Sequence, residues 1–97
     1  MKKIFKYIIT NNDVLRENVT LPYGAEILSA INQYDKLILY CLVDPEEDRK
    51  EDRTIIVKKT GEEIPQETID KIKYYHFQFL GTVSLFNGDF ILHIWVK

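Results

Sequence analysis

The dipeptide Asn87-Gly88 lies between two runs of alternating strand-forming residues near the C-terminal end of the chain. Asn-Gly accepts a positive φ at both central positions of a type I′ turn, whose twist matches that of the flanking strands. Residues 77–97 are therefore predicted to form a β-hairpin with a two-residue turn. Such a turn fixes the register, and it pairs Phe86 with Asp89, Leu85 with Phe90, Val83 with Leu92, Gly81 with Ile94, Ser84 with Ile91, Thr82 with His93 and Leu80 with Trp95.

The predicted register gives the hairpin two different faces. One face is apolar and is expected to form part of the core, with Val83, Leu85, Phe90, Leu92 and Ile94. The opposite face is mixed and carries Thr82, Ile91, His93 and Trp95. We favour the interpretation that this mixed face packs beneath a short helix. The alternative is that it meets a ligand or a partner, because aromatic side chains with polar groups are enriched in binding hot spots.

The rest of the chain also reads mainly as strands, predicted over residues 4–9, 17–21, 25–32, 36–43 and 54–58. Residues 10–13 and 22–24 have the composition of turns. Residues 36–43 are apolar on both faces, which predicts a central strand or one that lies against a partner subunit. Residues 64–75 predict a single short helix, with Pro65 in its first turn and Ile69 and Ile72 facing the sheet.

These patterns predict a mainly β protein: a small antiparallel β-sandwich or half-open barrel with one short helix, formed by residues 1–97 as a single domain. The segment 46–53 carries charges of both signs and is expected to be a solvated loop. Clustered carboxylates can hold a divalent cation, but the EF-hand pattern needs a central glycine that this segment lacks. We expect neither a metal nor a cofactor.

Composition narrows the class of partner. The net charge is −2 and there is no basic tract, so nucleic acid is not an expected partner. No uninterrupted apolar run approaches the ~20 residues of a membrane helix, and no signal-peptide pattern is present. The single cysteine, Cys41, excludes an intrachain disulfide and fits a reducing compartment. We therefore expect a soluble cytoplasmic protein with no membrane contact.

Catalytic motifs are missing from the sequence. There is no Gly-rich phosphate loop, no Gly-x-Ser-x-Gly, no His-Glu-x-x-His and no Cys-x-x-Cys. Cys41 with His93 or His76 is the one conceivable nucleophile and base pair. Because Cys41 is predicted to face inward from the most apolar strand, where a thiol acts as a small inert hydrophobe, we expect a non-enzymatic protein.

Several ordered blocks resemble a family of small uncharacterised proteins of bacteriophages and prophages. The blocks are Leu21-Pro22-Tyr23-Gly24-Ala25-Glu26-Ile27-Leu28, Leu39-Tyr40-Cys41-Leu42-Val43-Asp44-Pro45, Arg53, Thr60-Gly61, Leu80-Gly81-Thr82-Val83 and Gly88-Asp89-Phe90-Ile91-Leu92-His93. The resemblance covers nearly the whole chain, and residues 66–79 look longer than is typical. It implies an accessory protein that acts inside the infected bacterium, and it transfers no catalytic residue.

Small phage proteins of this kind resemble inhibitors of host defence, which act by stoichiometric binding. The leading hypothesis is an anti-defence factor in the host cytoplasm that sequesters a host immune protein or a nucleotide-derived signalling molecule. For the latter we expect a homo-oligomer with a pocket between subunits, lined by Tyr40, Arg53, Thr82, His93 and Trp95. The alternative hypothesis is a structural or assembly protein that binds another phage protein through the aromatic hairpin face.

Overall fold

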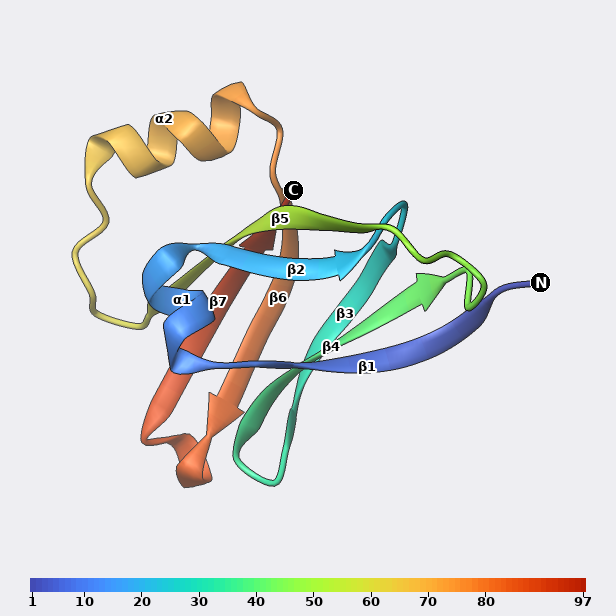
Figure 1. Cartoon of the computed structure of the whole chain (residues 1–97). Helices are drawn as coiled ribbons and strands as arrows, with labels where there is room; N and C mark the ends of the chain where they lie inside the picture. The colour runs from blue at the N-terminus through green and yellow to red at the C-terminus, as the bar shows by residue number, and fades with distance from the viewer.

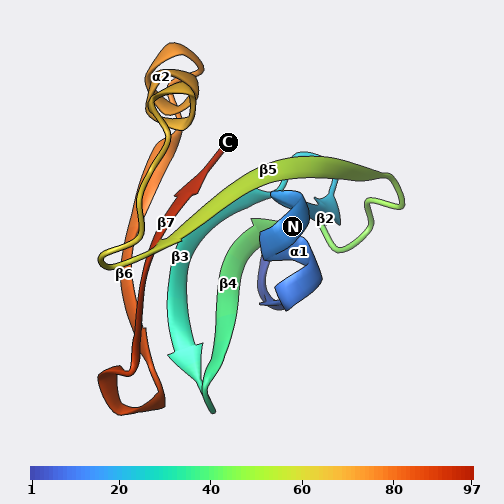
Figure 2. The same ribbon diagram turned by 90° about the vertical axis from the view of Figure 1, so that its left-hand side faces the viewer.

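Seven strands form two antiparallel sheets that pack against each other as an open sandwich (Figures 1 and 2). The computed structural model describes residues 1–97. The first sheet has the order β1-β4-β3 and the second the order β2-β5-β7-β6. The elements are β1 (Lys3–Ile9), α1 (Asn11–Arg16), β2 (Asn18–Pro22), β3 (Glu26–Gln33), β4 (Lys36–Val43), β5 (Lys50–Lys59), α2 (Gln66–Tyr74), β6 (Gln78–Leu85), η1 (Phe86–Gly88) and β7 (Phe90–Val96). The predicted fold class is confirmed, and the sheets stay open instead of closing into a barrel.

Strand β4 is the centre of the first sheet, as its apolar composition predicts. It pairs with β1 along one edge and with β3 along the other. Its inward side chains meet those of the second sheet in one core, in which Leu39, Cys41, Ile55 and Ile94 are completely buried. Burial of such side chains stabilises the fold by about 1.5–3 kcal/mol for each large aliphatic residue.

Strand β5 begins earlier in the chain than predicted, at Lys50 instead of Thr54. The prediction of a solvated loop over residues 46–53 is wrong for Lys50–Arg53, which pair with β2. The neighbouring strand satisfies the main-chain groups of this segment, and its charged side chains point away from the core or lie half-buried at its margin. Hydrogen bonding to β2 therefore makes this charged segment a strand, although its composition does not favour one.

The remaining part of that loop is held by Arg49. Its guanidinium contacts the Glu47 carboxylate with an Nη2–Oε1 distance of 2.6 Å and lies 4.2 Å from the centroid of the Tyr23 ring. Hydrogen bonds from Arg49 lower the pKa of the Glu47 carboxyl to about 2. The main-chain N–H of Tyr23 donates to the Arg49 carbonyl at 2.9 Å. The loop is thus fixed to the turn between β2 and β3.

A second helix, α1, lies where a turn was predicted after β1. Thr10 caps it: its hydroxyl accepts a hydrogen bond from the Asp13 N–H, while the Asp13 carboxylate accepts one from the Thr10 N–H. Glu17 ends the helix in the left-handed conformation. The prediction of a turn at residues 10–13 is wrong because this reciprocal capping box starts a helix.

The predicted turn of the last hairpin is present, but the strands end one residue earlier than expected. Asn87 and Gly88 have φ of 54° and 93°, and the Asp89 N–H donates to the Phe86 carbonyl. Phe86 itself has a φ of 51°, so the predicted strand pair of Phe86 with Asp89 does not form. The pairs from Leu85–Phe90 to Gly81–Ile94 are confirmed.

The predicted pair of Leu80 with Trp95 is wrong. A bulge between Phe79 and Gly81 shifts the register by one residue, so that Phe79 lies opposite Trp95. Gly81 has a φ of 135°, a conformation that glycine adopts far more readily than other residues. The bulge therefore sets two aromatic residues side by side on the outer face of the hairpin.

Helix α2 does not dock on the face of a sheet, contrary to the expectation. Figures 1 and 2 show it beyond the end of the second sheet. Ile69 and Ile72 are only half-buried, and no residue of the helix is fully buried. The mixed face of the hairpin was predicted to pack beneath this helix, and that prediction is wrong. Thr82 and Ile91 are exposed, and His93 and Trp95 are half-buried.

No helix has the length and apolar character needed to cross a membrane.

Candidate functional site

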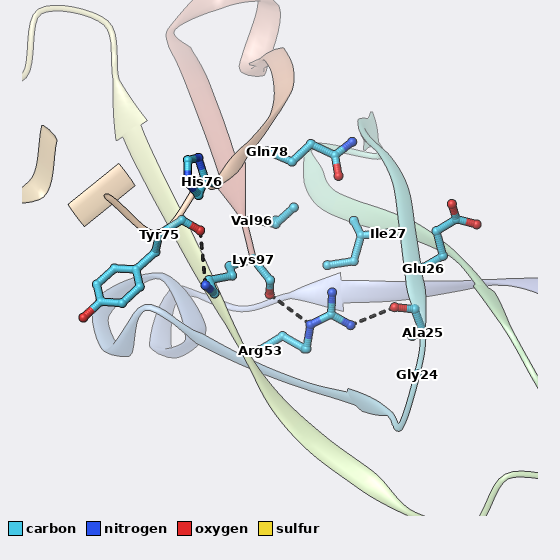
Figure 3. A pocket seen from close by; sticks show the side chains of 10 residues that line it. All are labelled: Gly24, Ala25, Glu26, Ile27, Arg53, Tyr75, His76, Gln78, Val96 and Lys97. Carbon is cyan, nitrogen blue, oxygen red and sulfur yellow. Dashed lines mark hydrogen bonds between the residues drawn. The ribbon is translucent and has the colours of Figure 1, made fainter. Parts of the chain in front are cut away.

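A pocket of about 500 Å³ lies at the end of the sandwich where the C-terminal end of β7 meets the start of β3 (Figure 3). Strands β3, β5, β6 and β7 and the segment after α2 all contribute to it. The lining residues are Gly24, Ala25, Glu26, Ile27, Arg53, Tyr75, His76, Gln78, Val96 and Lys97. These segments bring polar side chains together around Ile27 and Val96, and four of the ten lining residues are hydrophobic.

Arg53 on β5 is the most constrained polar residue of this pocket. Its Nε donates to the main-chain oxygen of Lys97 at 2.9 Å, and its Nη1 donates to the Ala25 carbonyl at 2.7 Å. Nη1 also lies 3.3 Å from the Glu51 carboxylate. Nη2 has no hydrogen-bond partner, and Figure 3 shows it pointing toward Ile27 and Val96 in the pocket. Two main-chain oxygens and the Glu51 carboxylate therefore fix the guanidinium plane and leave one nitrogen free for a ligand.

Lys97 places a second cation at the same pocket. Its ammonium donates to the Tyr75 carbonyl at 3.1 Å and lies 5.0 Å from the centroid of the Tyr75 ring. In Figure 3 the Glu26 carboxylate points away from Arg53, toward the outside. Glu26 lines the pocket and Glu51 pairs with Arg53, so the two cations of this region stand beside two carboxylates.

His76 reaches the pocket from the C-terminal end of α2. The Phe77 N–H donates to the Ile72 carbonyl and the His76 N–H to the Lys73 carbonyl, which is the hydrogen-bond pattern of a Schellman motif. His76 has a φ of 54° and occupies the position that is usually glycine in this motif. Non-glycine residues in this conformation are found at functional sites more often than elsewhere, and here the imidazole lines a pocket.

The predicted hairpin residues lie on the outer face of the second sheet. The His93 ring is held between two threonines, with Nε2 at 2.7 Å from the Thr60 hydroxyl and Nδ1 at 3.0 Å from the Thr82 hydroxyl. The next pair along the strands is Phe79 and Trp95, whose ring centroids are 5.1 Å apart. Both imidazole nitrogens have threonine partners, so the aromatic pair is the more available part of the face.

The five predicted site residues lie in three places within one chain. Arg53 is in the pocket; Thr82, His93 and Trp95 share the outer face of β6 and β7; and Tyr40 is on the outer face of β4, in the other sheet. The sequence reasoning missed Tyr75, His76 and Lys97. The only local signal for His76 was that the predicted helix ends without a glycine. That signal does not indicate which ligand the residue would bind.

Cys41 is completely buried in the core, and burial raises the pKa of its thiol to about 11. Burial, followed by the nearby Cys41, also raises the pKa of the Tyr7 hydroxyl. His93 projects from the outer face of the second sheet, so β7 lies between its ring and the Cys41 thiol. No three or more His, Cys, Asp or Glu side chains are grouped so that they could hold a metal ion.

The fold and the pocket together define a small antiparallel β-sandwich with a polar pocket at one end. By sequence, the chain matches a domain of unknown function, DUF7352, over residues 1–97 and belongs to that family. Neither a curated protein nor a solved structure matches it.

Proposed function

We propose that this protein is a phage accessory protein that binds without turnover: an anti-defence factor that sequesters a nucleotide-derived immune signalling molecule of the host. The proposal places the ligand in the Arg53 pocket and places the protein in the cytoplasm of the infected bacterium. The family resemblance described above motivates the biological setting. The chemistry of the pocket motivates the class of ligand.

One observation carries the proposal: Arg53 Nη2 has no partner and points into the pocket, while the other nitrogens of the same guanidinium are fixed. A cation that is already oriented loses little freedom when an anion binds. Arginine suits phosphate because its planar group offers donors in a fixed geometry. The Lys97 ammonium adds a second positive charge, and His76 and Gln78 add donors at the rim.

The pocket is large enough for more than inorganic phosphate, since drug-sized ligands occupy sites of about 300–1,000 Å³. Ile27 and Val96 offer apolar contacts to the non-phosphate part of such a ligand. These features support a nucleotide-like ligand over a simple ion. In a homo-oligomer, which we also propose, Tyr40 and the hairpin face would meet a second copy or the distal part of a larger ligand.

The test is calorimetric titration of the purified protein with inorganic phosphate, adenosine monophosphate and a cyclic dinucleotide. We expect the nucleotides to bind and to be recovered unchanged by chromatography. Arg53→Lys keeps the charge but loses the oriented nitrogen, and it should weaken binding by at least about tenfold, the effect of one charge-assisted hydrogen bond. Arg16→Lys, at the end of α1, changes an exposed arginine outside the pocket; it is the matched control and should bind normally.

Arg53 also supports the fold through Ala25 and Lys97, so a second variant is needed. Lys97→Met removes the ammonium and leaves the Arg53 hydrogen bonds to main-chain oxygens in place. It should weaken nucleotide binding while the thermal midpoint stays close to that of the parent protein. Catalytic hydrolysis of the ligands, or equal binding by the parent and both pocket variants, would contradict the proposal.

A protein partner is the second candidate function, and the Phe79–Trp95 pair favours it. Phe79 is exposed and Trp95 half-buried, and a paired aromatic surface of this kind is a typical hot spot. The partner would be a host immune protein or another phage protein. Trp95→Ala should then abolish the complex in a pull-down with the candidate partner, whereas Arg53→Lys should leave it intact.

A further inference from the structure

Strand β1 forms an open edge of the first sheet. It pairs only with β4, and no main-chain hydrogen bond links residues 3–9 to any other element. Its outer edge therefore presents unpaired N–H and C=O groups along seven residues. Such an edge is a template to which another strand can add.

Most side chains of β1 are exposed, on both faces of the sheet, whereas Ile9 belongs to the core. Ile4 and Ile8 point outward and are 58% and 52% exposed. Phe5 faces inward, in register with the buried Cys41, yet it is 42% exposed. The ring is uncovered because no strand lies beyond β1, and a further strand at this edge would cover it.

The charged side chains on β1 itself are all positive, and the nearest acidic residues in the register follow Val43 on β4, beginning with Asp44. Lys2, Lys3 and Lys6 are the only charged residues before Asp13. None of the three is in an ion pair; Lys6 donates a hydrogen bond to the Gln33 amide oxygen at 3.2 Å. Pairing of β1 with the β1 of a second copy would bring two sets of unpaired lysines together, so charge disfavours self-association at this edge.

We propose that β1 is a docking edge for an acidic, extended segment of a partner protein, which adds as a fourth strand to the β1-β4-β3 sheet. Apolar residues of the added strand cover Phe5, and its carboxylates lie beside Lys6 and the other lysines. Main-chain hydrogen bonds supply affinity, and the lysines select an acidic partner over a second copy. This surface is separate from the Arg53 pocket, and it stands independently of the proposed function.

The test uses a peptide as long as β1 that alternates glutamate with valine, and a second peptide with lysine in place of each glutamate. The ¹⁵N-labelled protein is titrated with each while amide shifts and hydrogen exchange are recorded. We expect the acidic peptide to slow exchange of amides along β1, and the lysine peptide to leave them unchanged.

Lys6→Glu should weaken binding of the acidic peptide by about tenfold or more, because it replaces an attraction with a repulsion. Lys73→Glu, on α2, makes the same change in net charge and should bind as the parent does. Three results would overturn the proposal: no binding of the acidic peptide, equal loss in both variants, or a dimer in sedimentation whose β1 amides are already protected without peptide.

Discussion

The Asp35 carboxylate accepts a hydrogen bond of 2.9 Å from the main-chain N–H of Phe86. The two residues belong to the tips of different hairpins, one from each sheet. A second bond runs alongside, because the Asn32 amide donates to the Ser84 carbonyl at 2.8 Å. These two bonds fasten the sandwich at the end opposite the Arg53 pocket.

Asp35→Ala should lower the free energy of unfolding by about 1–3 kcal/mol, because it leaves the Phe86 N–H unpaired and puts alanine at a φ of 59°. Asp35→Asn keeps an acceptor and tolerates this conformation, so it should cost much less. Urea unfolding measures both. Asp89→Ala, with the same change of charge in the adjacent loop, serves as control; an equal loss there would mean that charge alone is responsible.

His76→Gly should raise the free energy of unfolding by about 1 kcal/mol, because glycine adopts the left-handed conformation at a Schellman position without a steric penalty. We expect the same variant to bind nucleotide more weakly, since the imidazole leaves the pocket. Thermal unfolding and calorimetry measure the two effects separately. If the variant is more stable and binds as before, His76 is only a helix cap and has no part in the site.

Cys41 predicts a loss of stability at alkaline pH. The native thiol has a pKa of about 11, raised by burial from the ordinary value of 9.0. Between these values the unfolded chain releases a proton that the native state keeps, so stability is complete below pH 9 and falls as pH rises. The slope due to this one group is at most about 1.4 kcal/mol per pH unit.

The comparison protein for this effect is Cys41→Ala, which lacks the thiol but keeps every tyrosine and lysine that titrates in the same range. Its unfolding free energy should fall less steeply between pH 9 and pH 11 than that of the parent. In the native parent, iodoacetamide should label Cys41 only after unfolding. Rapid labelling of the folded protein would contradict the buried position.

Local patterns were sufficient to predict most of the strands. The double-sided apolar run over residues 36–43 predicted a central strand or one against a partner subunit, and β4 is central in its sheet. The Asn87-Gly88 dipeptide did determine a turn and most of its register. In each case a few neighbouring residues contain the whole signal, because side-chain alternation and backbone φ preferences are local properties.

The errors arose where distant contacts decided the outcome. Lys50–Arg53 join β5 because β2 offers a ladder, which their charges do not reveal. Phe86 leaves its strand where its N–H bonds to Asp35, and the bulge beside Gly81 moves Phe79 opposite Trp95. Helix α2 extends beyond the sheet, although its Ile69 and Ile72 gave it an apolar side.

The sequence alone determined a mainly β chain, its central strand, its single buried thiol and the hairpin with one apolar face. Only the tertiary structure decided that Arg53, His76 and Lys97 share a pocket while Tyr40 and His93 lie on opposite outer faces. The reason is physical: periodicity states which side of its own strand a residue occupies. Which strands lie together, and which guanidinium nitrogen remains unpaired, follow from packing between segments far apart in the chain.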